Sequence, residues 1–169
     1  QSRGLGDVYK RQAETRALVK TLLPGFSGSA VLDADGLNLL AAHPQWYQYL
    51  GEHVVLTPHI GEMSRLSGRT IQEIQHEIAD TALKCAAETG SVCVLKDACT
   101  VIADEKGQMY LNLSGNSGMA TAGSGDVLSG ILAAVLCMYL KTEEQPPMVL
   151  KAALGVYLHG LCGLSLIHI

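Results

Sequence analysis

Short apolar runs recur along the chain from residue 30 onward and alternate with longer segments of helical periodicity. The runs are rich in valine, isoleucine and leucine, which is typical of strands buried inside a sheet. They predict strands at Ala30–Leu32, Val54–Thr57, Val92–Leu95, Val101–Ala103 and Met109–Leu113. The last two are treated as a pair because the turn-like segment Asp104–Gly107 separates them.

The segments between the runs predict helices. Apolar residues at Ile71, Ile74, Ile78, Ala82 and Cys85 indicate one amphipathic helix over Thr70–Thr89, which Gly90 stops. Other helical segments are expected at Ala13–Leu23, Gly36–Ala42, Glu62–Leu66, Asp126–Tyr139 and Met148–Leu161. Strands that alternate with helices favour an α/β fold, with a mostly parallel sheet flanked by helices and ligands bound at the carboxyl ends of the strands.

Both ends of the chain look foreign to the rest. Asp7–Gln12 reads DVYKRQ, and one DNA sequence encoding it has a reverse complement that encodes LSLIHI, the sequence of Leu164–Ile169. Such an inverted repeat resembles the transposase end sequence used in sequencing libraries. We therefore expect residues 1–12 and 164–169 to be artefactual, adapter-derived segments, and residues 13–163 to be an internal part of one domain of a longer protein.

Composition excludes several classes of protein. The 169 residues are 48% hydrophobic and 17% charged, with a net charge of −4, which is ordinary for a globular domain. The basic residues are scattered, which argues against a nucleic-acid binder. The longest apolar stretch, Val127–Leu140, is too short to cross a bilayer, so no membrane partner is expected. Five cysteines without C-x-x-C spacing favour a reducing cytoplasm over a disulfide framework or a zinc site.

The glycine-rich segment Gly115–Leu128, GNSGMATAGSGDVL, is the most informative part of the chain. Gly123, Ser124 and Gly125 directly precede a predicted helix, whose first N–H groups are suited to binding phosphate. Asp126 at the helix start either caps the helix or takes a proton from a hydroxyl that attacks phosphorus. The segment is not a Walker A loop, because no Gly-Lys-Ser/Thr follows the glycines.

Two more segments place polar side chains at predicted strand ends. LTPHIGEMSRL displays His59 and Glu62 after Pro58 stops a strand. VLKDACT carries Lys96, whose ammonium group could meet a phosphate, and Thr100, which supplies a hydroxyl. A single histidine is more often structural or merely exposed than catalytic, and VLKDACT taken alone favours a strand that ends in a solvated turn.

Acidic and amide side chains follow the first predicted strand, in VLDADGLN. Asp33, Asp35 and Asn38 could hold Mg²⁺ through water or bind a substrate hydroxyl. Aspartate and asparagine after a strand are also common as turn formers, so both interpretations remain open.

In combination and in this order, VLDADGLN, LTPHIGEMSRL, VLKDACTVIA and GNSGMATAGSGDVLSGIL resemble the NAD(P)H-hydrate dehydratase family of the ribokinase-like superfamily. GVYLHGLCG at Gly155–Gly163 is similar to the carboxyl-terminal helix of that family. The resemblance runs from about Ala30 to Gly163. It implies the carboxyl-terminal part of a ribokinase-like fold, in which further strands precede the region present.

The resemblance also implies a repair reaction on hydrated NADH or NADPH. A nucleotide phosphorylates the ring hydroxyl, and loss of phosphate restores the double bond. The forms TPH-x-GE and GSGD resemble the branch that uses ADP, with ATP also possible, together with Mg²⁺. By this resemblance Asp126 is the catalytic base and, with His59, binds the hydrate. The implied nucleotide-binding residues are Lys96, Asp97, Ala98, Cys99, Thr100, Gly123, Ser124 and Gly125, and auxiliary candidates are Asp35, Asn38, Glu62 and Asn116.

Some features depart from the family pattern. Asp97 stands where the family usually has glycine, and Ile60 where it often has proline. The resemblance further implies a homo-oligomeric full-length protein and a fused or separate epimerase as partner. Because the preceding strands are missing, we expect residues 13–163 alone to be unstable and inactive.

Two other functions fit parts of the sequence. A ribokinase-like kinase for a vitamin precursor would share the glycines and Asp126 but release a stable phosphorylated product. A non-catalytic nucleotide-binding module is the second alternative, favoured by Asp97 and by the missing strands. TPHIGE and GNSGMAT favour the dehydratase over the kinase.

Overall fold

A computed structural model of the chain describes residues 16–114, 123–139, 143 and 145–167. Its centre is a five-stranded sheet in chain order, formed by β1 (Ala30–Leu32), β2 (Val54–Leu56), β3 (Val92–Leu95), β4 (Thr100–Ala103) and β5 (Met109–Asn112). The first three strands run parallel, whereas β4 and β5 each pair antiparallel with the preceding strand. The sheet is therefore mixed, and β1, β2, β3 and β5 run in one direction while β4 runs in the other, which confirms the prediction of a mostly parallel sheet flanked by helices. The connections after β3 and β4 are too short for the crossover that a parallel pairing needs.

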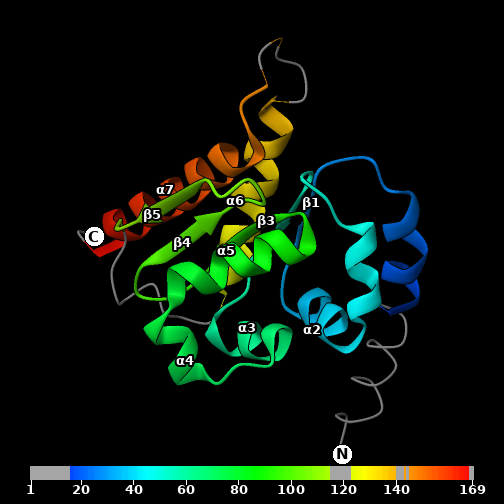
Figure 1. The fold of residues 1–169 in the computed structure, drawn as a ribbon. Coiled ribbons are helices and arrows are strands. Elements are labelled where there is room, and N and C mark those ends of the chain that lie inside the picture. The colour runs from blue at the N-terminus through cyan, green and yellow to red at the C-terminus, as the bar shows by residue number, and fades with distance from the viewer. Residues whose placement is uncertain (1–15, 115–122, 140–142, 144, 168–169) are drawn as a thin grey trace, which may run out of the picture.

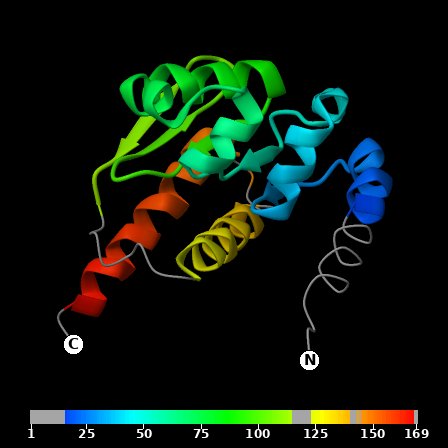
Figure 2. The ribbon, with the colours of Figure 1, turned by 90° about the horizontal axis from the view of Figure 1, so that it is seen from below.

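Helices cover both faces of the sheet. One face packs against α2 (Asp35–Ala42), α3 (Ile60–Ser67), α4 (Ile71–His76) and α5 (Ile78–Thr89), and the other against α6 (Ser124–Met138) and α7 (Met148–Ile167). Successive strand residues alternate between the two cores, as Leu56 and Val55 do. Figure 2 shows the resulting layers, with α6 (yellow) and α7 (orange to red) opposite the green helices.

Two of the helical segments on one face of the sheet differ from their predicted extents. The single helix expected over Thr70–Thr89 is two helices, because Glu77 has a non-helical backbone at φ −128° and ψ 46°. The Arg69 guanidinium holds this junction by donating to the Glu77 carboxylate and to the Thr81 hydroxyl, both at 2.7 Å. The turn expected at Glu62–Leu66 is a longer helix, α3, which His59 caps at its start and Gly68 ends at φ 69°.

The helices α6 and α7 also have bounds that differ from the sequence prediction. Helix α6 begins at Ser124 rather than Asp126, because Gly123 adopts the left-handed conformation at φ 90° and forms the N-cap. Helix α7 continues beyond Leu161 to Ile167. The earlier start of α6 places Ser124, Gly125 and Asp126 together in its first turn.

The remaining described segments are short. Residues 16–22 are helical, and 3₁₀ turns lie at Leu23–Gly25 and Pro44–Tyr49. Figure 1 shows the amino-terminal helix (blue) beside α2, at the β1 end of the sheet. Among the described residues, no helix combines the length and apolar character needed to cross a membrane.

Candidate active site

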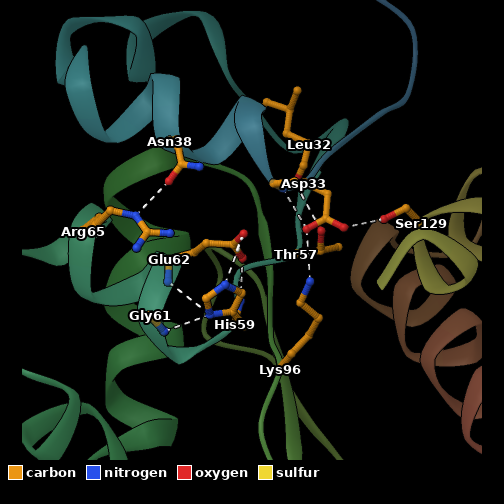
Figure 3. A network of polar contacts seen from close by, with 11 residues as sticks. Leu32, Asp33, Asn38, Thr57, His59, Gly61, Glu62, Arg65, Lys96 and Ser129 are labelled. Atoms are coloured by element: carbon orange, nitrogen blue, oxygen red, sulfur yellow. Dashed lines mark hydrogen bonds and ion pairs between the residues drawn. The ribbon is translucent and has the colours of Figure 1, made fainter. Parts of the chain in front are cut away.

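The polar side chains that follow β1, β2 and β3 meet at one edge of the sheet. Pairing of the second and third strands continues past their ends, since Lys96 donates its backbone N–H to the Pro58 carbonyl at 2.8 Å and forms a parallel bridge with His59. The Thr57 hydroxyl donates to the Leu32 carbonyl at 3.2 Å, which ties the end of β2 to that of β1. Figure 3 shows Asp33, His59 and Lys96 gathered at this edge.

Asp33 and Lys96 form the charged centre of the site. The Lys96 Nζ lies 3.0 Å from Asp33 Oδ1, and both side chains are largely shielded from solvent. Ser129 of α6 donates to the second carboxylate oxygen of Asp33 at 2.8 Å. Burial, the largest influence, opposes ionisation of Asp33, but the hydrogen bonds from Lys96 and Ser129 and the charge of Lys96 together lower its pKa below the ordinary value. Asp33 is therefore a carboxylate that joins the sheet to α6.

The backbone directly after Asp33 is strained. Ala34 has φ 47° and ψ −111°, a left-handed conformation that residues with a side chain rarely adopt, and its N–H donates to Asp33 Oδ1 at 2.9 Å. Strain of this kind persists only where surrounding contacts fix it, and it concentrates at functional sites. It supports the assignment of this strand end to the site.

His59 has a structural role in addition to its predicted one. Its Nδ1 accepts from the N–H groups of Gly61 at 2.9 Å and Glu62 at 3.3 Å, while Glu62 accepts from the His59 N–H at 2.9 Å. This reciprocal arrangement is a capping box at the start of α3. The His59 side chain is 53% exposed, whereas that of Glu62 is buried, and His59 Nε2 lies 3.4 Å from Glu62 Oε1.

The first turn of α6 lies against the charged centre. A Cβ atom placed on Gly125 would lie 3.6 Å from Lys96 Nζ and 3.7 Å from Asp33 Oδ2, so the helix backbone itself reaches these groups. Asp126 is exposed in the same turn. The N–H groups of a first helical turn lack partners within the helix, and beside a lysine they form a suitable environment for phosphate.

His159 of α7 contacts the same turn. Its Nε2 lies 3.3 Å from the Ser124 hydroxyl oxygen. Burial is the main cause of a lowered pKa for His159; the charge of Lys96 lowers it further, and a hydrogen bond with the Ser124 backbone acts in the opposite direction. The imidazole is therefore mainly neutral at pH 7.

The other predicted nucleotide-binding residues lie at the same edge. Lys96 to Cys99 form the turn between β3 and β4, with Asp97 and Ala98 exposed, and Thr100 begins β4. The structure thus brings this turn and the start of α6 together, although their roles in binding stay predictions.

Two of the remaining auxiliary candidates lie in α2, and one lies outside the described residues. Asp35 begins α2, and Asn38 follows one turn later, where its Oδ1 accepts from Arg65 Nε at 2.7 Å. Asn116 lies outside the described residues. Within the described part of the chain, no three histidine, cysteine, aspartate or glutamate side chains gather to hold a metal ion. Asn38 bonds Arg65, and Asp33 bonds Lys96 and Ser129, so a role of these residues in holding Mg²⁺ stays a prediction.

Sequence reasoning did not assign roles to Ser129 and His159. Ser129 had a usable signal, because it follows Gly125 by one helical turn and interrupts an apolar helix. His159 had none, since a single histidine in an apolar helix is usually structural or exposed. Its contact with Ser124 spans 35 residues of sequence and needs the packing of α7 on α6.

Comparison with solved structures defines the class of protein. A ribokinase-like superfamily protein from Enterococcus faecalis superposes with a TM-score of 0.74 at 30% identity, covering 90% of this chain and 51% of that one. The ADP/ATP-dependent NAD(P)H-hydrate dehydratase from Bacillus subtilis, co-crystallized with ATP/Mg²⁺, gives a TM-score of 0.61 at 35% identity over 78% of this chain and 44% of that one. The fold is ribokinase-like.

Sequence comparison gives the family. The family model described as NAD(P)H-hydrate dehydratase matches residues 3–168, and the chain belongs to this family. It is 48% identical over 161 residues to the bifunctional NAD(P)H-hydrate repair enzyme Nnr of Moorella thermoacetica, covering 94% of this chain and 29% of that protein. It is 38% identical over 132 residues to the ADP-dependent (S)-NAD(P)H-hydrate dehydratase of Neisseria meningitidis, covering 77% and 43% respectively.

The chain is short beside these relatives. It spans 29% of the Moorella protein and 43% of the Neisseria protein. The fold and the family are therefore established, and the activity of the whole protein is a matter for proposal.

Proposed function

We propose that this chain carries the nucleotide-binding and catalytic part of an ADP-dependent dehydratase that restores hydrated NADH or NADPH. The observation that carries the proposal is the meeting of α6 with the sheet edge, where Gly125 lies against Lys96 and Asp33 while the Asp126 side chain is exposed beside them. The first turn of α6 supplies N–H groups without partners in the helix and the Asp126 carboxylate, and Lys96 after β3 supplies a cation beside it; together they suit phosphoryl transfer to a hydroxyl. The relatives named as dehydratases support the choice of substrate.

The proposed reaction has two steps. The hydroxyl of the hydrated nicotinamide ring attacks the terminal phosphorus of ADP, a new P–O bond forms, and the bond to the leaving AMP breaks. The hydroxyl proton passes to the Asp126 carboxylate. Phosphate then leaves the ring as its C–O bond breaks, a neighbouring carbon loses a proton, and the ring double bond re-forms. The products are AMP, phosphate and the repaired cofactor.

The described residues have distinct proposed tasks in this scheme. Lys96 and the first turn of α6 hold the transferred phosphate, and the turn through Asp97, Ala98 and Cys99 to Thr100 borders the nucleotide. Asp33 fixes the Lys96 ammonium group through the 3.0 Å ion pair. His59 offers its exposed side chain to the hydrated dinucleotide while its Nδ1 caps α3.

Mg²⁺ is proposed to accompany the nucleotide. The described residues gather no metal-binding cluster, so phosphate oxygens and water are its expected ligands, as is common for this ion. A direct role for Asp35 or Asn38 in holding it stays a prediction, as does any role for Asn116.

Other properties of the whole protein remain proposals of the same kind. A cytoplasmic location, a homo-oligomeric full-length form and an epimerase partner are expected for a repair enzyme of this family. The Moorella relative is named as bifunctional, which supports looking for a second activity in the same protein. The assignment of residues 1–12 and 164–169 to adapter sequence is tested by reading the source genomic DNA at those codons.

The role of Asp126 is tested by the substitution Asp126→Ala in the protein encoded by the complete source gene. Turnover should fall by a factor of 10³ or more, on the order expected when a positioned base and its charge are lost, while nucleotide affinity changes little. The matched control is Asp80→Ala, which removes an exposed aspartate from the first turn of α5 on the opposite face of the sheet. Loss of nucleotide binding with turnover intact would reject the assigned role.

A further inference from the structure

The packing of α7 on α6 brings a histidine to the start of α6. Gly155 of α7 is buried against α6, where a Cβ atom would lie 2.7 Å from Leu132 Cδ2 and 3.5 Å from Leu132 Cα. The missing side chain lets the two helix backbones approach closely. His159 lies one turn further along the same face of α7, because residues four apart share a helix face.

His159 contacts the residue that begins α6. The distance from its Nε2 to the Ser124 hydroxyl oxygen is 3.3 Å, within hydrogen-bonding range. The ring is half-buried, and Lys96 is near enough for its charge to oppose protonation of the imidazole. His159 therefore lies beside the first turn of α6, next to the proposed phosphate site.

Ser124 needs support at this position. The N-cap of α6 is Gly123, which has no side chain and a left-handed backbone at φ 90°, and no side chain among the described residues caps this helix start. Ser124 is followed directly by Gly125, whose backbone lies against Lys96 and Asp33. A turn flanked by two glycines has more conformational freedom than one fixed by a capping residue. His159 supplies a contact that restricts it.

We propose that His159 is a positioning residue of the phosphoryl-transfer site, which holds the Ser124 hydroxyl and the first turn of α6 in the orientation that receives the terminal phosphate of the nucleotide. The inference rests on the proposed function for the identity of the nucleotide. It adds a residue from α7 to a site otherwise built from strand ends and α6.

The test measures Mg·ADP affinity by calorimetry in the protein encoded by the complete source gene, with variants His159→Leu, His159→Gln, Ser124→Ala and the double variant His159→Leu/Ser124→Ala. Both His159→Leu and Ser124→Ala should weaken Mg·ADP binding about tenfold, a loss of about 1.4 kcal/mol. Glutamine keeps a nitrogen close to the position of Nε2, so His159→Gln should stay within about threefold of the unchanged protein. The control, His76→Leu, alters an exposed histidine on α4 and should leave affinity unchanged.

The double variant separates positioning from general structural damage. If His159 acts through Ser124, the double variant binds Mg·ADP no more weakly than either single variant, because the two substitutions remove one interaction. Losses that multiply, or a change below twofold for His159→Leu, would overturn the proposal. If His159→Leu fails to fold, the other two single variants decide. A tenfold loss of Mg·ADP affinity in Ser124→Ala, with a loss of no more than about threefold in His159→Gln, supports the proposal. Unchanged Mg·ADP affinity in Ser124→Ala overturns it.

This readout is independent of the dehydratase reaction. Should the unchanged protein bind Mg·ADP but fail to restore hydrated NADH, the proposed function fails while the role of His159 is still decided by affinity. Steady-state kinetics add a second check, in which His159→Leu raises KM for the nucleotide about tenfold and changes KM for the hydrated cofactor less than twofold.

Discussion

At the scale of single residues, Asp33 connects most of the site. It follows β1, pairs with Lys96 after β3 and accepts from Ser129 in α6, so three separate elements converge on one carboxylate. The sequence predicted Asp33 as a metal ligand, a hydroxyl binder or a turn former. Its pairing with a lysine 63 residues away could not be predicted, because it depends on the adjacency of strand ends that only the folded sheet creates.

The ion pair predicts an acid-sensitive contribution to stability. The pKa of Asp33 in the folded chain is below its ordinary value of 3.8, so the contribution is complete above pH 3.8 and is lost as the pH falls through the lower folded value. The substitution Asp33→Asn should lower the free energy of unfolding near pH 7 by about 1 kcal/mol, a figure reduced for the remaining solvent exposure of the pair. The substitution should also make the free energy of unfolding depend less steeply on pH below pH 3.8.

Chemical denaturation between pH 2 and 7 measures both effects. The control is Asp80→Asn, an exposed aspartate on α5 for which no such change is expected. If the free energy of unfolding of Asp33→Asn falls below pH 3.8 as steeply as that of the unchanged protein, the ion pair does not stabilise the fold.

At the scale of elements, local sequence signals predicted the existence of most strands and helices, and tertiary contacts decided their limits. The five strands lie where apolar runs predicted them. The break between α4 and α5 was missed because the apolar spacing continues through Glu77, whereas the break is fixed by Arg69 reaching across from the preceding loop. The extension of α3 was missed because histidine is an uncommon helix cap.

The glycines of α6 and α7 give opposite predictions for the same substitution. Gly160 of α7 lies against the loop after β5, where a Cβ atom would lie 2.8 Å from the Ser114 backbone oxygen, and Gly130 of α6 has no neighbour within 4 Å of its Cβ position. We expect Gly160→Ala to lower the free energy of unfolding by about 2 kcal/mol through overpacking against backbone. Gly130→Ala should raise it by about 0.5 to 1 kcal/mol through helix propensity.

Thermal and chemical unfolding of the two variants check this difference. Because both substitutions add one methyl group to a helix, their comparison isolates the effect of packing. Equal stabilisation by Gly160→Ala and Gly130→Ala would show that α7 does not lie as close to Ser114 as described.

At the scale of the whole molecule, the resemblance of four ordered segments was enough to predict the family, and the comparisons confirm it. The mostly parallel sheet and the turn-linked pair of its last two strands follow from the sequence, whereas the antiparallel pairing of β3 with β4 was not predicted. In the described part of the chain, β1 pairs only with β2, and its residues are half-buried.

The short span of the chain relative to its relatives predicts a weak fold. Residues 13–163 expressed alone should show a shallow, non-cooperative thermal transition and no dehydratase activity, because β1 pairs on one side only among the described residues and an open strand edge weakens a sheet. Calorimetry together with an activity assay measures both properties. A sharp cooperative transition accompanied by dehydratase activity would contradict this expectation.

The most direct test of the central claim is recovery of reduced-nicotinamide absorbance from hydrated NADH by the protein encoded by the complete source gene, with Mg²⁺ and either ADP or ATP. The account predicts recovery that depends on a nucleotide, with AMP and phosphate formed when ADP is the donor. Tight nucleotide binding without any recovery would contradict it and would favour a vitamin-precursor kinase or a non-catalytic nucleotide-binding module on the same fold.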